Sequence, residues 1–273
     1  MAPQGDADVQ AYLNATGITD PTTVGAITTL VSDLKSAGTA NGGTFWDNLI
    51  AFYPIAGTNA SAQSYNLKNT TQYNITWSGG LTHNALGATG NGSTGFGDTG
   101  WIPSLDANYW SGNQSGGFGW YAQNSLSGTT MAFAAGPSGA NGQARLMNFS
   151  FQGNGFLDFA DKAAGVEPGR IVNPALLGTG HIINVSENNV GANTSTLRAY
   201  KNGSLVGGRV DTLSAVKANA PNTPMKLFKR DDGYYSNITI SSAFISYLID
   251  NTEVSTFDGI VNAYQTTMSR NTY

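Results

Sequence analysis

From about residue 55 onward, short runs of β-branched and aromatic residues alternate with clusters of glycine, asparagine and serine. Such clusters favour tight turns and such runs favour extended backbone, so this texture predicts many short strands. No helical pattern separates them, and we therefore expect antiparallel pairing in two packed sheets. The predicted strands are Ile75–Trp77, Gly95–Thr99, Gly117–Gln123, Thr129–Ala135, Arg145–Phe151, Gly155–Ala160, His181–Ser186, Thr196–Lys201, Ser204–Gly207, Met225–Lys229 and Asn237–Tyr247.

The strongest single pairing signal is the Asn202-Gly203 dipeptide, which separates two of these extended runs. Asn-Gly is the preferred two-residue hairpin turn because both of its central positions need a positive φ. The sequence therefore predicts a hairpin that joins Thr196–Lys201 to Ser204–Gly207.

Helical patterns precede the strand-rich region. Asp20 can cap a helix that starts at Pro21, and Gly38 can end it in the left-handed conformation. A shorter helix is expected from Asp8 to Asn14, and a helical turn from Phe45 to Phe52. The apolar residues of the capped helix fall on one face, at spacings of three and four: Val24, Ile27, Leu30, Val31 and Leu34.

Such a narrow apolar stripe must pack on something, either the main domain or a partner. We interpret residues 1–44 as a helical attachment or oligomerisation segment of a homo-oligomer, and residues 45–273 as the main domain. That domain ends in a helix, which Asp250 or Asn251 can cap and whose stripe runs from Val254 to Met268. The predicted fold class is all-β: an antiparallel two-sheet jelly-roll sandwich with a small N-terminal helical segment and a C-terminal helix.

Charge and hydropathy exclude several classes of protein. Only 11% of the residues are charged and the net charge is −4. The densest basic cluster, Lys226, Lys229 and Arg230, is followed at once by Asp231 and Asp232, so we interpret it as a solvated loop rather than a nucleic-acid site. No apolar run is long enough for a membrane helix, and no membrane partner is expected.

The surface chemistry suggests a place outside the cell, because the polar residues are mostly hydroxyls and amides. Residues 1–10 nevertheless lack the basic and apolar segments of a secretory signal. Assembly in the cytoplasm and release by lysis, as for virion proteins, would reconcile the two observations.

The acidic residues do not suggest a catalytic pair. A glycan hydrolase needs two carboxylates about 5 to 10 Å apart. The glutamates, Glu167, Glu187 and Glu253, each stand alone, and Asp158 and Asp161 would point to opposite faces of one strand. We identify no catalytic residue and predict that the chain is not an enzyme.

Metal and cofactor chemistry is equally sparse. The chain has two histidines, His83 and His181, and no cysteine, so zinc sites are not expected and we predict hydrogen-bonded strand histidines. No cofactor is predicted. Ca²⁺ is the one metal considered, with turn capping as the favoured alternative role for its candidate ligands. These are Asp98, Asp106, Asn108, Asp231 and Asp232.

Aromatic residues in or beside the glycine-rich loops are the candidate ligand-binding residues. Exposed aromatic rings stack on sugars and anchor protein interfaces, although a place in the sandwich core is equally open for each. The candidates are Trp101, Tyr109, Trp110, Tyr234 and Tyr235.

Six short segments follow one another in a recognisable order: Phe52–Gly57, Tyr65–Lys68, Gly79–His83, Gly87–Gly92, Ala199–Gly203 and Asp258–Arg270. Their order resembles a concanavalin A-like lectin/glucanase domain, a laminin-G-like jelly roll of bacteriophage and bacterial surface proteins. The resemblance implies a two-sheet jelly roll on a virion or cell surface. The Glu-x-Asp-x-x-Glu or Glu-x-Asp-x-Glu strand of the glucanase members is absent here.

The leading hypothesis is a non-enzymatic structural or adhesive virion protein of a phage, such as a capsid decoration, head-fibre or tail-associated protein. Its partners would be capsid or tail proteins, and its location the virion. A bacterial cell surface or extracellular location is the alternative. The second hypothesis is a soluble carbohydrate-binding module that contacts host-surface glycans, and the third is a glycan hydrolase.

Overall fold

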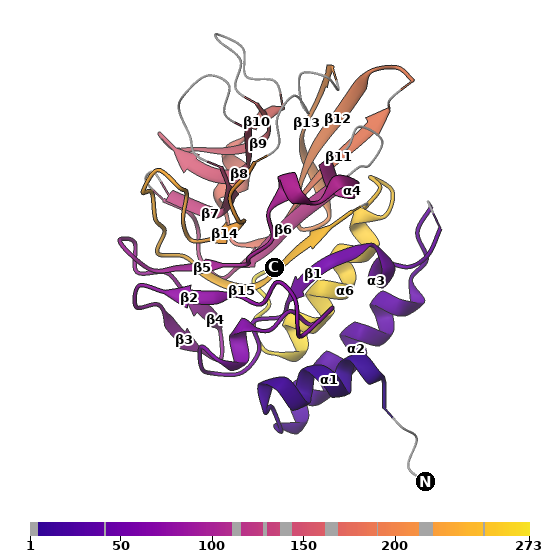
Figure 1. Cartoon of the computed structure of the whole chain (residues 1–273), viewed down its shortest axis with the longest axis vertical. Helices are drawn as coiled ribbons and strands as arrows, with labels where there is room; N and C mark the ends of the chain where they lie inside the picture. The colour runs from indigo at the N-terminus through magenta and orange to yellow at the C-terminus, as the bar shows by residue number, and fades with distance from the viewer. Residues whose placement is uncertain are drawn as a thin grey trace.

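The computed structural model describes residues 5–40, 42–110, 116–127, 130–136, 144–161, 169–189, 191–212, 221–247 and 249–273. Within these ranges the chain folds mainly into β-strands, which form two packed antiparallel sheets (Figure 1). The predicted fold class is confirmed: an all-β antiparallel sandwich with small helices at its N-terminal end and one helix at its C-terminal end.

The first sheet has eight strands: β1 (Leu49–Tyr53), β3 (Thr82–Asn84), β4 (Gly87–Thr89), β6 (Gly116–Ala122), β11 (Gly180–Asn189), β12 (Thr194–Lys201), β13 (Ser204–Thr212) and β15 (Thr239–Ser246). Their order is β13-β12-β11-β6-β15-β4-β3, and β1 also pairs with β15. The second sheet has seven strands: β2 (Thr76–Ser78), β5 (Phe96–Asp98), β7 (Thr130–Ala135), β8 (Ala144–Phe151), β9 (Asn154–Asp161), β10 (Arg170–Val172) and β14 (Lys226–Leu227). Their order is β10-β9-β8-β7-β14-β5-β2.

The helices are short and lie mostly at the two ends of the chain. None of those in the described ranges has the length and apolar content that crossing a membrane requires. The α-helices are α1 (Ala7–Thr16), α2 (Pro21–Ser36), α3 (Phe45–Asn48), α4 (Ala107–Trp110) and α6 (Val254–Thr267). The 3₁₀ turns are η1 (Ala62–Ser64), η2 (Pro103–Leu105) and η3 (Pro174–Leu177).

Local chemistry explains where these elements begin and end. The Asp20 carboxylate accepts a hydrogen bond from the Thr23 N–H at 2.8 Å, which caps α2 as predicted. The predicted Asn202-Gly203 turn is confirmed, with φ angles of 52° and 72°. The predicted left-handed Gly38 is wrong, because α2 ends at Ser36 and the next residue is already extended.

Each predicted strand overlaps an observed one, but four observed strands were missed. Strands β3, β4 and β10 have three residues each, too few for an alternating pattern to show. The predicted helical turn from Phe45 to Phe52 is partly wrong. The helix ends at Asn48, and Leu49–Tyr53 form β1, which is buried on both faces and therefore shows no alternation.

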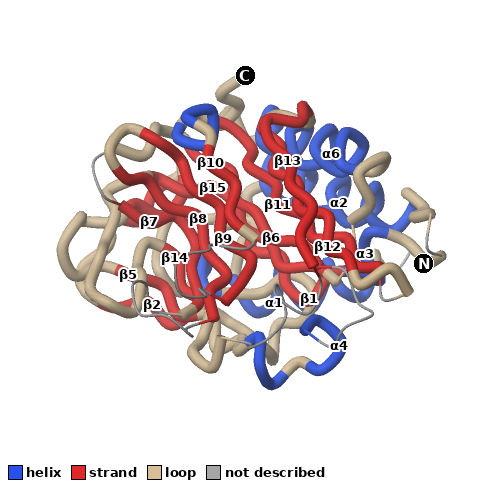
Figure 2. The backbone as a smooth tube through the Cα atoms, turned by 90° about the horizontal axis from the view of Figure 1, so that it is seen from above, coloured by secondary structure: helices blue, strands red, loops and turns tan. Residues whose placement is uncertain are grey.

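The two sheets and the helices form three layers, and the apolar residues form two main cores between them. One core lies between the two sheets and includes Phe118, Phe133 and Ile182. The second lies on the outer face of the eight-stranded sheet, where Ile183 and Phe244 pack beneath the helices. Consecutive strand residues point to opposite faces, so β11 contributes side chains to both cores. Figure 2 shows α2, α3 and α6 together on one side of the strands.

The apolar stripe of α2 is buried within this chain. Ile27, Leu30, Val31 and Leu34 are at most 1% exposed and share a core with α6, while Val24 is half-buried. The predicted use of this stripe for assembly is therefore corrected: its apolar surface is satisfied inside the fold. The division into residues 1–44 and 45–273 stays a prediction, as does oligomerisation, which would need another surface.

We predict that Leu30→Ala lowers the free energy of unfolding by about 2–5 kcal/mol, because it opens a cavity between α2 and the sheet. Urea denaturation followed by circular dichroism measures this loss. The matched control is Thr29→Ala on the exposed side of α2, which should stay within about 0.5 kcal/mol of wild type. A Leu30→Ala variant of unchanged stability but smaller mass in solution would restore the assembly role.

Candidate functional site

The outer face of the seven-stranded sheet is the sheet surface on which no helix of the described ranges packs. Directly paired residues of neighbouring strands point to the same face, so the register defines the residues on it. We call this surface the open face. One row of it crosses the sheet through Thr76, Asp98, Lys226, Ala134, Asp158 and Arg170.

One end of this row is held by an ion pair. Arg170 donates from Nε and Nη2 to the two carboxylate oxygens of Asp158 at 2.6 and 2.7 Å. The guanidinium also lies 5.3 Å from the centroid of the Phe156 ring, which packs on the buried Met131 and Ala134. At this end of the open face, the ion pair therefore lies beside apolar side chains.

Strand β14, which pairs with β7 on one side and β5 on the other, continues into a tight hairpin from Phe228 to Ser236. The Ser236 N–H donates to the Phe228 carbonyl at 3.0 Å, and the Arg230 N–H to the Tyr234 carbonyl at 2.9 Å. Gly233 turns the chain with a φ of 91°, which favours glycine. We call this segment the 228–236 hairpin.

Tyr234 lies on one side of the 228–236 hairpin. Its ring centroid is 4.3 Å from the guanidinium carbon of Arg230. Arg230 is only 5% exposed and also donates to Asp232 at 2.8 Å, so it is a fixed support. Tyr234 itself is 41% exposed, and the hairpin thus presents a flat aromatic ring backed by a buried cation.

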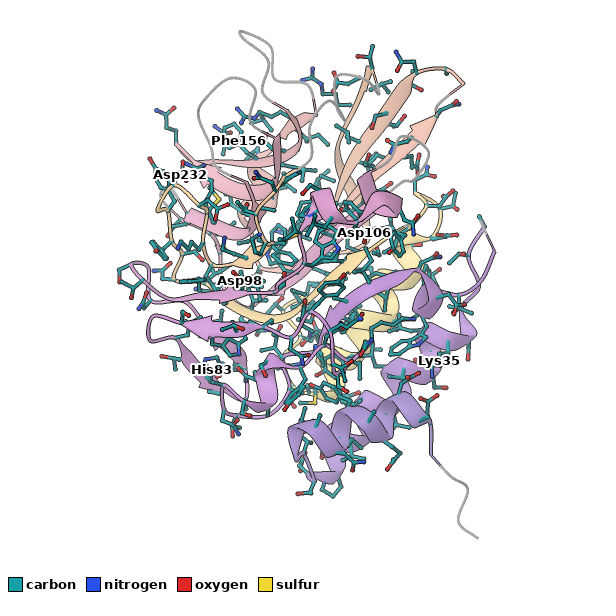
Figure 3. All side chains as sticks on the ribbon, in the orientation of Figure 1. Lys35, His83, Asp98, Asp106, Phe156 and Asp232 are labelled. Atoms are coloured by element: carbon teal, nitrogen blue, oxygen red, sulfur yellow. The ribbon has the colours of Figure 1, made fainter. Side chains whose placement is uncertain are left out.

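The opposite side of the hairpin faces the sheet surface. Lys229 pairs with Tyr235 across the hairpin, and its Nζ is 5.4 Å from that ring and 4.2 Å from the ring of Phe96 on β5. Phe96 lies on the same strand and face as Asp98, which places Lys229 on the open face. In Figure 3, Asp98, Phe156 and Asp232 lie on the side of the molecule away from Lys35.

A second polar group gathers around Asp106 at the end of η2. Its carboxylate accepts hydrogen bonds from the Trp101 Nε1–H at 3.2 Å and the Tyr247 hydroxyl at 3.1 Å. Burial, helped by the nearby Asp106 charge, raises the pKa of Tyr247 to about 12. The phenol therefore stays protonated at neutral pH and serves as a donor to Asp106.

The structure separates the aromatic candidates. Trp101 and Tyr109 are at most 1% exposed, and their rings meet edge to face at 4.7 Å inside the core between the sheets. Their predicted ligand-binding role is corrected, since a ring so deeply buried offers no face to a ligand. The Trp110 side chain lies outside what the structure describes. Tyr234 and Tyr235 remain at the surface, and their ligand-binding role stays a prediction.

The candidate calcium ligands have other partners. Asp98 accepts a backbone hydrogen bond in its own turn, Asp231 pairs with Lys226 at 2.5 Å, and Asp232 binds Arg230. In the part of the chain that the structure describes, no three acidic, histidine or cysteine side chains gather as a metal site would require. The turn-capping alternative explains the carboxylate of Asp98, whereas Asp231 and Asp232 form ion pairs that the sequence did not predict.

Both histidines are hydrogen-bonded strand residues, as predicted. The His83 Nδ1 lies 2.8 Å from the Gln63 Oε1, and burial lowers the pKa of His83. The buried His181 Nδ1 lies 2.8 Å from the Asp258 Oδ1. Among the described residues no serine hydroxyl is bonded to either ring, and the hydroxyl that joins the His181–Asp258 pair is that of Tyr273, which donates to Asp258 Oδ2 at 2.8 Å.

The glutamates have structural partners where the structure describes them. Glu187 forms an ion pair with Arg198, and Glu253 accepts a hydrogen bond from the Asp250 N–H at 2.9 Å. Glu167 lies outside the described residues. The contacts of Lys229 with the rings of Phe96 and Tyr235 were not predicted, because the sequence showed this lysine only as part of a mixed-charge loop.

No protein-family model matches the sequence, and no curated protein matches it. Among solved structures, the Trypanosoma rangeli sialidase in complex with sialic acid has a TM-score of 0.52 at 13% identity, covering 87% of this chain and 38% of the sialidase. The same sialidase in complex with 2,3-difluoro-KDN has a TM-score of 0.53 at 12% identity, with the same coverage. The receptor-binding domain of the botulinum neurotoxin C/D mosaic serotype has a TM-score of 0.51 at 11% identity, covering 78% of this chain and 52% of that domain.

Identities this low show a shared fold alone, a lectin-like β-sandwich, and the chain spans less than half of the sialidase. The neighbours nevertheless overturn two predictions. The prediction of a non-enzymatic phage virion protein is corrected, because the structural neighbours are sialidases and a toxin receptor-binding domain. The statement that the chain is not an enzyme is corrected for the same reason, since enzymes contain this fold.

The observed positions of Trp101 and Tyr234 predict a large effect on stability for one alanine substitution and a small effect for the other. Trp101→Ala should lower the free energy of unfolding by about 3–5 kcal/mol, because it empties part of the core between the sheets. Tyr234→Ala should change it by roughly 0.5 kcal/mol or less, since the ring is exposed. Chemical denaturation of both variants checks the assignment, and equal losses would contradict it.

Proposed function

We propose that this chain is a glycan-binding protein whose sandwich is a concanavalin A-like jelly roll. The observation that carries the proposal is the 228–236 hairpin, which offers the exposed ring of Tyr234 on a fixed Arg230 support and Tyr235 beside Phe96. Tyrosine suits such recognition because its rigid ring loses little conformational entropy and its hydroxyl can bond to a sugar.

The fold neighbours support glycans as the ligand class. The T. rangeli sialidase is recorded in complex with sialic acid, and the toxin domain binds a receptor. The low charge content and the hydroxyl-rich surface fit a protein that works outside the cell, on glycans of a host or neighbouring cell surface. The motifs that resemble concanavalin A-like domains point to the same class of ligand.

We predict that Tyr234→Ala weakens binding to glycans at least about tenfold, because it removes the exposed stacking surface. Glycan-array screening of the wild type identifies the ligands, and titration calorimetry with the best of them measures the loss. Tyr234→Phe is the matched control, since it keeps the ring. If Tyr234→Ala binds glycans with the affinity of the wild type, the Tyr234 side of the hairpin is not part of the binding site.

Glycan hydrolysis is the second candidate, because the fold is shared with sialidases and because Asp106 and Tyr247 place a carboxylate 3.1 Å from a phenol. Sialidases use a tyrosine nucleophile. With its pKa raised to about 12, Tyr247 would need a base to take its proton, and Asp106 already accepts that hydrogen bond.

A fluorogenic sialoside tests this candidate. If the pair is catalytic, the wild type turns the substrate over, and Tyr247→Phe lowers the rate at least about 100-fold. Tyr65→Phe, which removes a hydroxyl beside the helical core, controls for unspecific effects. Absence of turnover in the wild type would exclude sialoside hydrolysis, and binding would stand alone.

A further inference from the structure

The 228–236 hairpin holds four consecutive charged residues, and three of them form ion pairs. Arg230 binds Asp232, and Asp231 binds Lys226. Lys229 is different: no carboxylate in the described part of the chain lies within ion-pair distance of its Nζ. Among the described residues, the hairpin therefore carries one cation whose charge is not balanced by a neighbouring acid.

Two aromatic rings hold this cation in place. The Lys229 Nζ lies 4.2 Å from the Phe96 ring centroid and 5.4 Å from that of Tyr235. The negative faces of the rings favour the charged ammonium without neutralising it. Phe96 comes from β5 and Tyr235 from the hairpin itself, so two separate segments fix the position of the lysine. A lysine fixed in this way loses less conformational entropy when it binds a ligand.

We propose that Lys229 is the anion-recognising group of this surface, and that the ligand is a glycan with a carboxylated sugar, such as a uronic or sialic acid residue. The carboxylate would contact the Lys229 Nζ while the sugar ring lies against Tyr235 on the open face. This inference rests on the proposed glycan-binding function and adds the chemical class of its ligand.

The surrounding charges favour a singly charged sugar over a polyanion. Asp98, Asp231 and Asp232 lie on or beside the same end of the sheet, and the whole chain has a net charge of −4. The neighbouring cations, Lys226 and Arg230, are already occupied by carboxylates. A densely sulfated polymer would meet these acids, whereas one carboxylate needs only the one cation that is left.

The two sides of the hairpin also set the length of the ligand. Lys229 and Arg230 are successive residues of an extended segment, so their side chains point to opposite faces of the hairpin. Tyr235 lies with Lys229 on one face, and Tyr234 lies with Arg230 on the other. An oligosaccharide that reaches over the hairpin would contact both Tyr234 and Tyr235, while a single sugar would contact one of them.

The test compares matched ligands that differ in one carboxylate: 3′-sialyllactose with lactose, and galacturonate oligomers with their methyl esters. A heparin oligosaccharide is the sulfated arm. In titration calorimetry we expect wild type to bind each carboxylated ligand about tenfold or more tightly than its neutral partner. Lys229→Met should remove most of this difference and Lys229→Arg should retain it, with unfolding midpoints checked for every variant. Lys201→Met, on the eight-stranded sheet, is the control and should discriminate like wild type.

The outcomes separate this inference from the function on which it rests. Equal wild-type affinity for the carboxylated and neutral ligands would overturn the role of Lys229 and leave glycan binding intact. Tighter binding of the heparin oligosaccharide would overturn the choice of a single carboxylate. Wild type that binds no glycan of the array would overturn both proposals together.

Discussion

The arrangement of this molecule depends on the helices that bury one face of the eight-stranded sheet. Phe257 of α6 meets Phe244 of β15 edge to face at 4.8 Å, and the buried Asp258 binds His181 of β11 beside them. Burial of the aromatic rings stabilises this contact, and the paired histidine satisfies the carboxylate that burial would otherwise penalise. The helices cover the outer face of the eight-stranded sheet. The open face therefore belongs to the seven-stranded sheet.

The end of α6 is fixed by a buried cation. Arg270 is 2% exposed and donates to the carbonyls of Pro54 and Ile55 at 3.2 and 3.0 Å. Ile55 has a φ of 45°, a region that β-branched residues rarely occupy, so these hydrogen bonds hold a strained turn just after β1. The helical layer, the first strand and the closing segment are thus joined at one point. The α6 helix that is held there shares a core with the apolar stripe of α2, which is why that stripe is not available to a partner.

The sequence predicted those features that neighbouring residues decide. Asp20 caps α2 and Asn202-Gly203 turns a hairpin through local chemistry, and both are as expected. Burial is decided by distant contacts, so the loop aromatics could not be sorted: Trp101 lies in the core and Tyr234 at the surface. Phe96 and Lys229 meet only because β5 pairs with β14, and the sequence gives no sign of that pairing.

The function was predicted wrongly for the same reason: it depends on contacts between distant residues. The motifs that suggested a surface protein are turns and strand ends, which report the fold, and one sandwich can serve an enzyme, a toxin domain or a binding module. Ligand chemistry depends on the charges that the fold leaves without a partner. Only 11% of the residues of this chain are charged, and its other polar residues are mostly hydroxyls and amides. A lysine held between two rings, with its neighbours already paired, therefore carries more information about the ligand than the fold does.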